Sequence, residues 1–211
     1  MKKTVVLLIL FVLPLVAYLF FASGVNNFGR LPILQENITD VAKHNAEVSL
    51  NNKITVLGFL GEDIENRKGN AFNLNQKIYK RFNGFDDFQL VMMVPKGTEA
   101  KVAELKKELG TFTDITNWNF VFASPEEIKS FFEMLGTDDV LDETLATPYV
   151  YIIDKQRNLR GRDDDEDEGV KYGFDTSKVA DLNNKMEDDV KIILAEYRLA
   201  LKKNNADRSK K

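Results

Sequence analysis

The sequence contains no cysteine and only one histidine, His44, among its 211 residues. Without a thiol the chain cannot form a disulfide, use a thiolate as a nucleophile or bind a metal through cysteine. Metal sites built from several histidines of one chain are excluded in the same way. His44 itself lies in a stretch without regular periodicity, and we interpret it as a surface or edge residue.

An excess of positive charge is also missing, because 29 Lys and Arg stand against 33 Asp and Glu, for a formal net charge of -4. This balance gives no reason to expect nucleic acid as a partner. Apolar residues make up 44% of the chain and include 15 Phe. That supply is enough for the core of one domain of ordinary size, with some residues left for other segments.

One uncharged run, Thr4 to Ala22, follows Lys2 and Lys3 at the N-terminus. Its length of about 19 residues is close to the roughly 20 that cross a bilayer as a helix. We therefore expect a transmembrane anchor or signal over residues 1–24, with its two lysines in the cytoplasm. The alternative is a secretory signal cleaved near Ala22-Ser23-Gly24, although the apolar part of such signals is usually ~7–15 residues long.

This prediction places the rest of the chain outside the cytoplasm. The expected localisation is the inner membrane, crossed once, with the C-terminal domain facing the periplasm of a Gram-negative cell; after cleavage the chain would be secreted. No cysteine follows the run, which excludes a lipoprotein anchor. Residues 25–45 are predicted to be a linker, since Asn26, Asn27, Gly29 and Pro32 interrupt any periodicity.

Apolar strands and amphipathic helices alternate over residues 46–204. The predicted strands are residues 54–60, 88–94, 118–122, 149–153 and 159–162, the fifth antiparallel to the fourth. The predicted helices are residues 73–82, 99–110, 125–135 and 179–203. This order predicts an α/β domain with a mixed sheet flanked by helices and a long C-terminal helix, followed by a basic tail at 205–211.

A run of acidic residues interrupts the pattern after the fifth strand. It consists of Asp163, Asp164, Asp165, Glu166, Asp167 and Glu168. Carboxylates arranged around one point could bind Ca²⁺ or another hard cation. The run lacks the spacing and the glycine of a calcium loop, however, and such runs are typical of solvated loops. Both interpretations are kept at this stage, and no cofactor is predicted.

The order of the elements resembles that of the Sco/SenC family of thioredoxin-like proteins over residues 51–197. The best local matches are WNFV at 118–121, SPEEI at 124–128 and YIID at 151–154. Members of this family bind copper and serve the assembly of cytochrome c oxidase, or act as thiol–disulfide reductases. The resemblance therefore implies a thioredoxin-like domain tethered to a membrane and facing the periplasm.

The chain departs from the family at its functional positions. Aligning Phe59 with the family's aromatic residue places Glu62 and Asn66 where the two cysteines stand. Counting back from Tyr151 places Ala146 at the copper-binding histidine. A Cu(I) site made of two thiolates and one imidazole therefore cannot form.

Two further features belong to the same comparison. Met92 and Met93 carry soft thioethers, but adjacent residues of a strand point to opposite faces, so both are predicted to pack in the core. Thr147-Pro148 stands directly before a strand, like the cis-proline of thioredoxins. The sequence leaves the cis and trans isomers of this bond equally open.

These observations predict a non-enzymatic binding or assembly protein of the cell envelope, with a membrane segment at Thr4–Ala22 and a protein partner. Assembly of a respiratory oxidase is implied by the resemblance alone. One alternative is an enzyme using the carboxylates of Glu62, Asp63 and Glu65, which we interpret instead as capping a helix start. The other is a divalent-cation site in the 163–168 run.

Overall fold

The computed structural model describes residues 3, 10–16, 18 and 29–208, with the backbone alone for 201–208. The predicted anchor at Thr4–Ala22 therefore lies largely outside the described residues. Within the described part of the chain, no helix combines the length and the apolar character that a membrane crossing requires.

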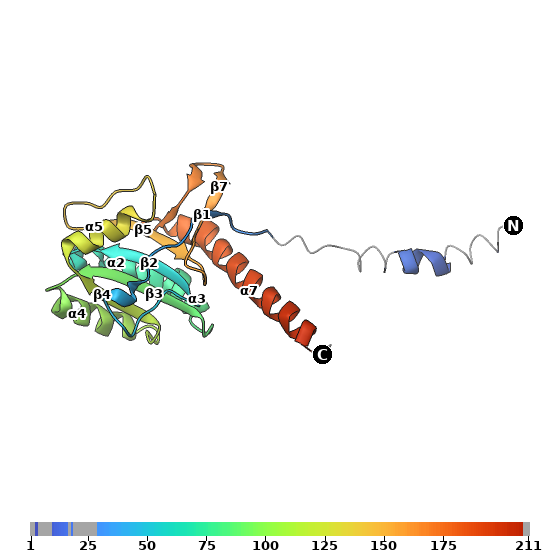
Figure 1. Cartoon of the computed structure of the whole chain (residues 1–211), viewed down its shortest axis with the longest axis horizontal. Helices are drawn as coiled ribbons and strands as arrows, with labels where there is room; N and C mark the ends of the chain where they lie inside the picture. The colour runs from blue at the N-terminus through green and yellow to red at the C-terminus, as the bar shows by residue number, and fades with distance from the viewer. Residues whose placement is uncertain (1–2, 4–9, 17, 19–28, 209–211) are drawn as a thin grey trace.

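A central strand, β2 (Ile54–Leu60), organises the sheet, and all seven of its residues are buried. It runs parallel to β3 (Phe88–Pro95), which is parallel to β4 (Trp118–Ala123). On its other side β2 is antiparallel to β5 (Ala146–Ile153). Continuous apolar sequence is what a strand covered on both faces requires. The predicted thioredoxin-like mixed α/β sheet is confirmed in this arrangement (Figure 1).

The outer edge of β5 is paired in two separate pieces. Its end binds β6 (Leu159–Arg160), and its middle binds β9 (Gly173–Asp175), both antiparallel. Between these pieces the chain leaves the sheet as the hairpin β7 (Arg162–Asp165) and β8 (Gly169–Lys171). The acidic run is therefore part of a β-hairpin rather than a plain loop.

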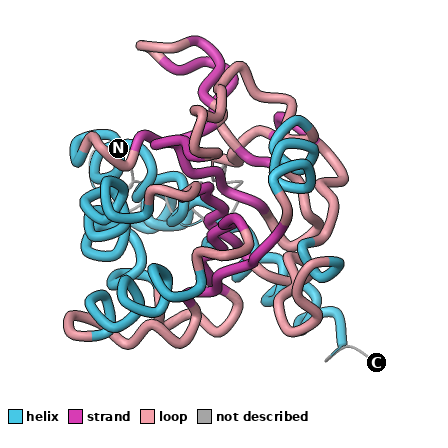
Figure 2. The backbone as a smooth tube through the Cα atoms, turned by 90° about the vertical axis from the view of Figure 1, so that its left-hand side faces the viewer, coloured by secondary structure: helices cyan, strands magenta, loops and turns pink. Residues whose placement is uncertain are grey.

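Helices cover both faces of the sheet (Figure 2). The first is a continuous helix with one π turn, made of α2 (Ile64–Leu74), Asn75–Tyr79 and α3 (Lys80–Phe82). It begins well before the predicted Asn73, because its exposed first turns carry few apolar residues and so lack a periodic signal. The others are α4 (Glu99–Gly110) and α5 (Pro125–Glu133).

The residues that precede the helices differ in whether their side chains cap them. Ser124 and Glu127 form a capping box at the start of α5, in which each side chain accepts from the other's backbone amide. Thr98 precedes α4, but its hydroxyl donates to the Pro95 carbonyl instead of accepting from the helix. Ser177, which precedes the last helix, donates from its amide and its hydroxyl to Asp175.

The last helix starts with α6 (Val179–Asp181), passes through a π turn at Leu182–Met186 and continues as α7 (Glu187–Arg208). Its buried residues Leu182, Met186, Val190 and Ile193 join the core on the α2 and α4 side of the sheet. Beyond these turns α7 leaves the body of the domain (Figure 1).

The two sides of the sheet have separate cores. Met92 belongs to the core under α2, α4 and α7, and Met93 to the core under α5. The predicted packing of these methionines on opposite faces is confirmed.

The segment predicted as a linker is part of the domain from Leu31 onward. Ile33–Gln35 forms β1, which pairs antiparallel with β6. Ile38 and Val41, the latter at the start of the short 3₁₀ helix Val41–Lys43, are buried against the α5 side of the sheet. The interrupted hydrophobic periodicity of this segment therefore reflects an irregular backbone. It does not mean that the segment lies outside the core of the domain.

Arg160 joins both ends of the domain. Its side chain is 4% exposed, and its Nη1 lies 3.0 Å from Asp154 Oδ2. Nη2 donates to Glu196 of α7 at 2.8 Å, and Nε donates to the Leu31 carbonyl at 2.7 Å. One guanidinium therefore connects the N-terminal segment, the β5–β6 turn and the last helix.

We expect Arg160→Met to lower the free energy of unfolding by about 3–5 kcal/mol, because Asp154 would remain buried without its cation. Urea unfolding of the purified chain measures this difference. Lys191→Ala is the control, since Lys191 is 50% exposed in its pairs with Glu187 and Asp188. Such a surface pair contributes about 1 kcal/mol or less. An equal loss of unfolding free energy in the two variants would contradict the conclusion that Arg160 connects these segments.

Candidate functional site

The turn after β2 brings two of the three family-site positions together. Gly61 has φ of +66°, and the Glu62 amide donates to the Thr144 carbonyl at 2.8 Å. Leu60 pairs with Ala146 across the β2–β5 ladder. A Cβ on Gly61 would lie 2.4 Å from the Thr144 oxygen and 2.8 Å from the Ala146 Cβ. The turn at Gly61 and the start of β5 at Ala146 therefore lie directly against each other.

Asn66, at the third position, is occupied in capping α2. Asp63 is the N-cap residue, and its carboxylate accepts from the Asn66 amide at 3.5 Å and from Asn66 Nδ2 at 2.5 Å. The predicted capping role of this turn is therefore present. Glu62 is exposed, and its carbonyl accepts from Lys101 Nζ at 2.9 Å.

A carboxylate that sequence reasoning missed closes the site from the other side. Asp142 Oδ1 accepts from the Thr144 amide at 2.9 Å, the Thr144 hydroxyl at 2.7 Å and the Ala146 amide at 3.0 Å. Its Oδ2 accepts from Arg67 of α2 at 2.6 Å. Burial alone would raise the pKa of Asp142, but these hydrogen bonds outweigh it and lower the pKa.

The spacing Asp142-Glu143-Thr144 is the only local signal that could have revealed this turn, since Asp side chains often bond to the backbone two residues on. Its partner Arg67 is remote in sequence. The pair holds the loop before β5 against the first turns of α2.

The site offers little for acid–base catalysis. Asp63 is engaged with Asn66, Asp142 with Arg67, and Glu65 with Lys68 at 2.8 Å. For Asp142 the hydrogen bonds lower the pKa, and a carboxylate held in its charged form in this way is a weak general acid at neutral pH. The geometry therefore does not favour the alternative of an enzyme that uses this turn.

The Thr147–Pro148 bond is trans, which decides between the two isomers left open by the sequence. Both residues lie within β5, whose extended backbone continues through them. The Pro148 carbonyl accepts from the Thr176 amide at 2.9 Å and from the Thr176 hydroxyl at 2.6 Å. The segment after β9 thus occupies the edge of β5 at the proline.

The acidic hairpin is held to the last helix by cations. Asp165, whose side chain is 1% exposed, binds Lys185 at 2.6 Å and Arg162 at 3.4 Å. Asp167 also binds Lys185, at 2.7 Å, and Glu168 binds Lys171, at 2.7 Å. Among the residues that the structure describes, no three Asp, Glu or His side chains are arranged to hold a metal ion. Three of the six predicted metal ligands, Asp165, Asp167 and Glu168, therefore form ion pairs with Lys or Arg side chains of the protein.

The remaining acids of the run, Asp163, Asp164 and Glu166, are exposed. His44 lies away from this hairpin, with Nδ1 3.4 Å from Glu127 Oε1 and an 11% exposed side chain. It is thus a partly buried edge residue paired with the start of α5.

No protein-family model matches the chain, and the search of curated proteins finds no match either. Solved structures do show similarity. A SCO1/SenC family lipoprotein from Bacillus anthracis is 18% identical, with a TM-score of 0.39, over 76% of this chain and 98% of the other. Copper-bound ScoI from Arabidopsis thaliana is 18% identical, with a TM-score of 0.44, over 68% and 89%.

A thiol:disulfide interchange protein from Bacteroides sp. is 14% identical, with a TM-score of 0.45, over 76% of this chain and 90% of the other. The neighbours thus include both Sco/SenC proteins and thiol:disulfide oxidoreductases, the kinds of protein named by the sequence resemblance. This chain lacks the cysteines that thiol–disulfide chemistry requires.

Two glycines test the geometry of the turn. Gly61→Ala is expected to lower the free energy of unfolding by about 1–3 kcal/mol, because alanine at positive φ is strained and its Cβ meets the Thr144 carbonyl. Gly69→Ala is the matched control in α2, where a Cβ meets nothing within 4 Å. It should stabilise the chain by about 0.5–1 kcal/mol. Denaturant unfolding measures both, and a neutral Gly61→Ala would refute the close approach.

Asp165 predicts how the hairpin responds to acid. Burial raises the pKa of this carboxyl, but the hydrogen bonds from Lys185 and from the Asp167 amide outweigh burial and lower the pKa to about 2. The stabilisation is thus complete above the ordinary value of 3.8 and is lost as the pH falls towards about 2. Asp165→Asn should therefore flatten the slope of unfolding free energy against pH in this window.

Unfolding measured at several pH values between about 4 and 2 gives that slope. The exposed Asp163→Asn is the control and should keep the slope of the unmodified chain. A steep slope retained in Asp165→Asn would mean that other carboxylates carry the acid response.

Proposed function

We propose that this chain is a non-redox, protein-binding domain of the cell envelope, whose binding face lies at the emptied thioredoxin-like site. The observation that carries the proposal is the position of Val140. Its side chain is 77% exposed, although the loop around it is anchored at both ends. We take Val140, which stands between the anchored residues Asp139 and Asp142, as the apolar contact of the proposed face.

The loop is anchored on both sides of Val140, by a hydrogen bond at Asp139 and by an ion pair at Asp142. Asp139 accepts a hydrogen bond from the buried Tyr151 hydroxyl at 2.9 Å, and burial raises the pKa of Asp139. Asp142 binds Arg67 of α2, as described above. Because both anchors are tied to the sheet or to α2, little ordering of this loop would remain to be done on binding.

The rim of this face is acidic. Glu62 and Glu65 lie at the start of α2, and Asp138 and Glu143 lie on the loop, all exposed. Of the cations nearby, Arg67 and Lys68 are paired with carboxylates, and Lys101 donates to the Glu62 backbone carbonyl. The partner should therefore present basic residues around an apolar contact, since complementary charge steers association.

The cellular setting is part of the same proposal. We place the domain at the periplasmic side of the inner membrane, attached by the Thr4–Ala22 segment; secretion after cleavage is the alternative. Assembly of a respiratory oxidase is the specific role suggested by the Sco/SenC resemblance, and it rests on analogy between folds.

Site-specific photo-crosslinking tests the binding face. A photoreactive amino acid at position 140 of the full chain should give one discrete adduct in envelope membranes. Reversing two rim charges, with Glu62→Lys and Glu143→Lys, should reduce its yield about fivefold or more, as expected for two pairs of up to about 1 kcal/mol each.

Position 170 is the matched control, because Val170 is also exposed, at 44%, but lies on the β7–β8 hairpin. An adduct of equal yield at both positions, or an adduct indifferent to the charge reversal, would contradict the proposed face.

A further inference from the structure

The end of the chain has a charge opposite to the rest. Residues 198–211 contain six of the 29 Lys and Arg of the chain but only one of its 33 Asp and Glu. This end therefore has a formal net charge of +5, whereas the preceding 197 residues have -9. Basic blocks of this kind are typical of segments that bind polyanionic surfaces.

The basic end is carried on a projecting helix. Tyr197 is the last residue of α7 that packs against the core in the part of the chain whose side chains are described, and Lys155 Nζ lies 5.3 Å from its ring centroid. Arg198 is exposed, and from there to Arg208 the helix extends about 16 Å, at 1.5 Å per residue. Figure 1 shows these turns directed away from the sheet.

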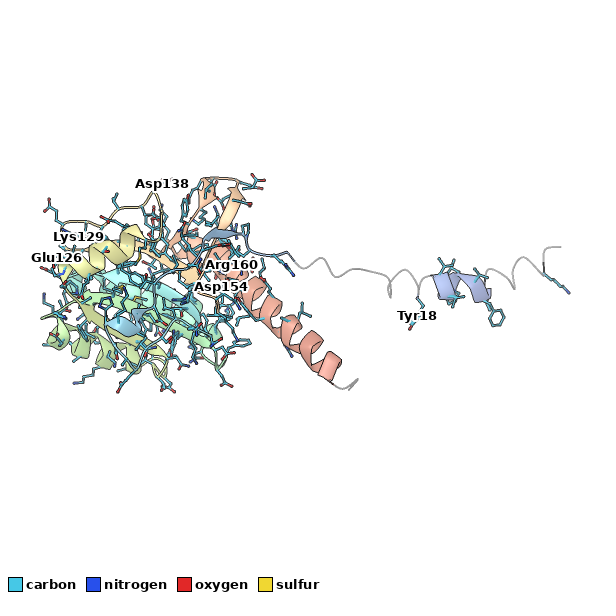
Figure 3. The ribbon with its side chains drawn as sticks, in the orientation of Figure 1. Tyr18, Glu126, Lys129, Asp138, Asp154 and Arg160 are labelled. Atoms are coloured by element: carbon cyan, nitrogen blue, oxygen red, sulfur yellow. The ribbon has the colours of Figure 1, made fainter. Side chains whose placement is uncertain are left out.

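Arg160 determines where this helix stands relative to the N-terminal segment. It binds the Leu31 carbonyl and the Glu196 carboxylate at the same time. The point where the N-terminal segment enters the domain is therefore one side chain away from the point where α7 leaves it. Figure 3 labels Arg160 and Asp154 close together at the base of α7.

We infer that the distal half of α7, residues 198–208, docks on a bilayer surface of anionic phospholipids. The inference rests on the part of the proposed function that puts Thr4–Ala22 in a membrane. Residues 23–30 can span at most about 28 Å, so the base of α7 stays close to that membrane. Lys and Arg near an anionic surface are attracted within a Debye length, about 8 Å at physiological salt.

The acidic hairpin of the same chain is not the occupant that the geometry favours. It is attached to the helix at Asp189, through Arg162 Nε at 2.9 Å. Lys202 is 13 residues further along α7, about 20 Å away along a rigid helix. The helix would have to bend back for its lysines to reach the hairpin. It can contact an anionic lipid surface without bending, and the net positive charge of the basic end complements that surface.

The absence of cysteine allows a direct test. Asn204→Cys gives the full chain a single thiol, which is labelled with a fluorophore and reconstituted into nanodiscs with a headgroup-attached quencher. Discs of phosphatidylglycerol and phosphatidylcholine should quench at least about twofold more than discs of phosphatidylcholine alone. In 1 M NaCl, where the Debye length is about 3 Å, this difference should disappear.

Charge reversal supplies the control. Lys202→Glu with Lys203→Glu should abolish the extra quenching in anionic discs. Lys107→Glu with Lys129→Glu changes the net charge equally at exposed positions on α4 and α5 and should leave it intact. Equal loss in both pairs would overturn the inference, because net charge rather than the helix would then be responsible.

The remaining outcomes are distinguishable. Quenching that is equal in both kinds of disc, in a chain that elutes with the discs, overturns the docking and leaves the membrane anchor of the proposed function intact. A chain that does not elute with the discs overturns both. Quenching that depends on protein concentration rather than on phosphatidylglycerol would mean that the helix binds a second copy of the chain. That result would overturn the proposed docking on lipid.

Discussion

The buried guanidinium of Arg160 is the interaction on which the domain's outer half depends. A cation this deep is tolerable only when its partners surround it, and here two carboxylates and one carbonyl do so. Those partners come from three distant parts of the chain. The inner strands are held by apolar packing, whereas the N-terminal segment, the β5–β6 turn and α7 share one electrostatic centre.

At the turn after β2, hydrogen bonds and close packing hold several polar groups in structural roles. The Asp142 turn fills one side of the junction, Asp63 and Asn66 saturate the helix start, and Gly61 permits the two to approach without space for a side chain. Asp63, Glu65 and Asp142 each have a partner in the structure. The exposed residues around this turn include Glu62, Val140 and Glu143, on which the proposed binding face is based.

The sequence predicted the parts of the fold that local patterns encode. The β2 strand is continuously apolar, and Met92 and Met93 lie on opposite faces as strand geometry requires. The start of α2 was missed because exposed helical turns carry no apolar period. The Arg67–Asp142 and Arg160–Glu196 pairs could not be predicted, since nothing local in the sequence specifies which distant charges meet.

The hairpin between β6 and β9 is closed at its neck: a Cβ on Gly161 would lie 2.4 Å from the Lys171 carbonyl. Strand pairing to β5 stops at Arg160 and resumes at Gly173, so residues 161–172 form an excursion whose ends adjoin. A module of this type can be lengthened, shortened or exchanged in evolution while the sheet around it keeps its register. This edge is therefore where relatives of the chain would be free to diverge in length without altering their common frame.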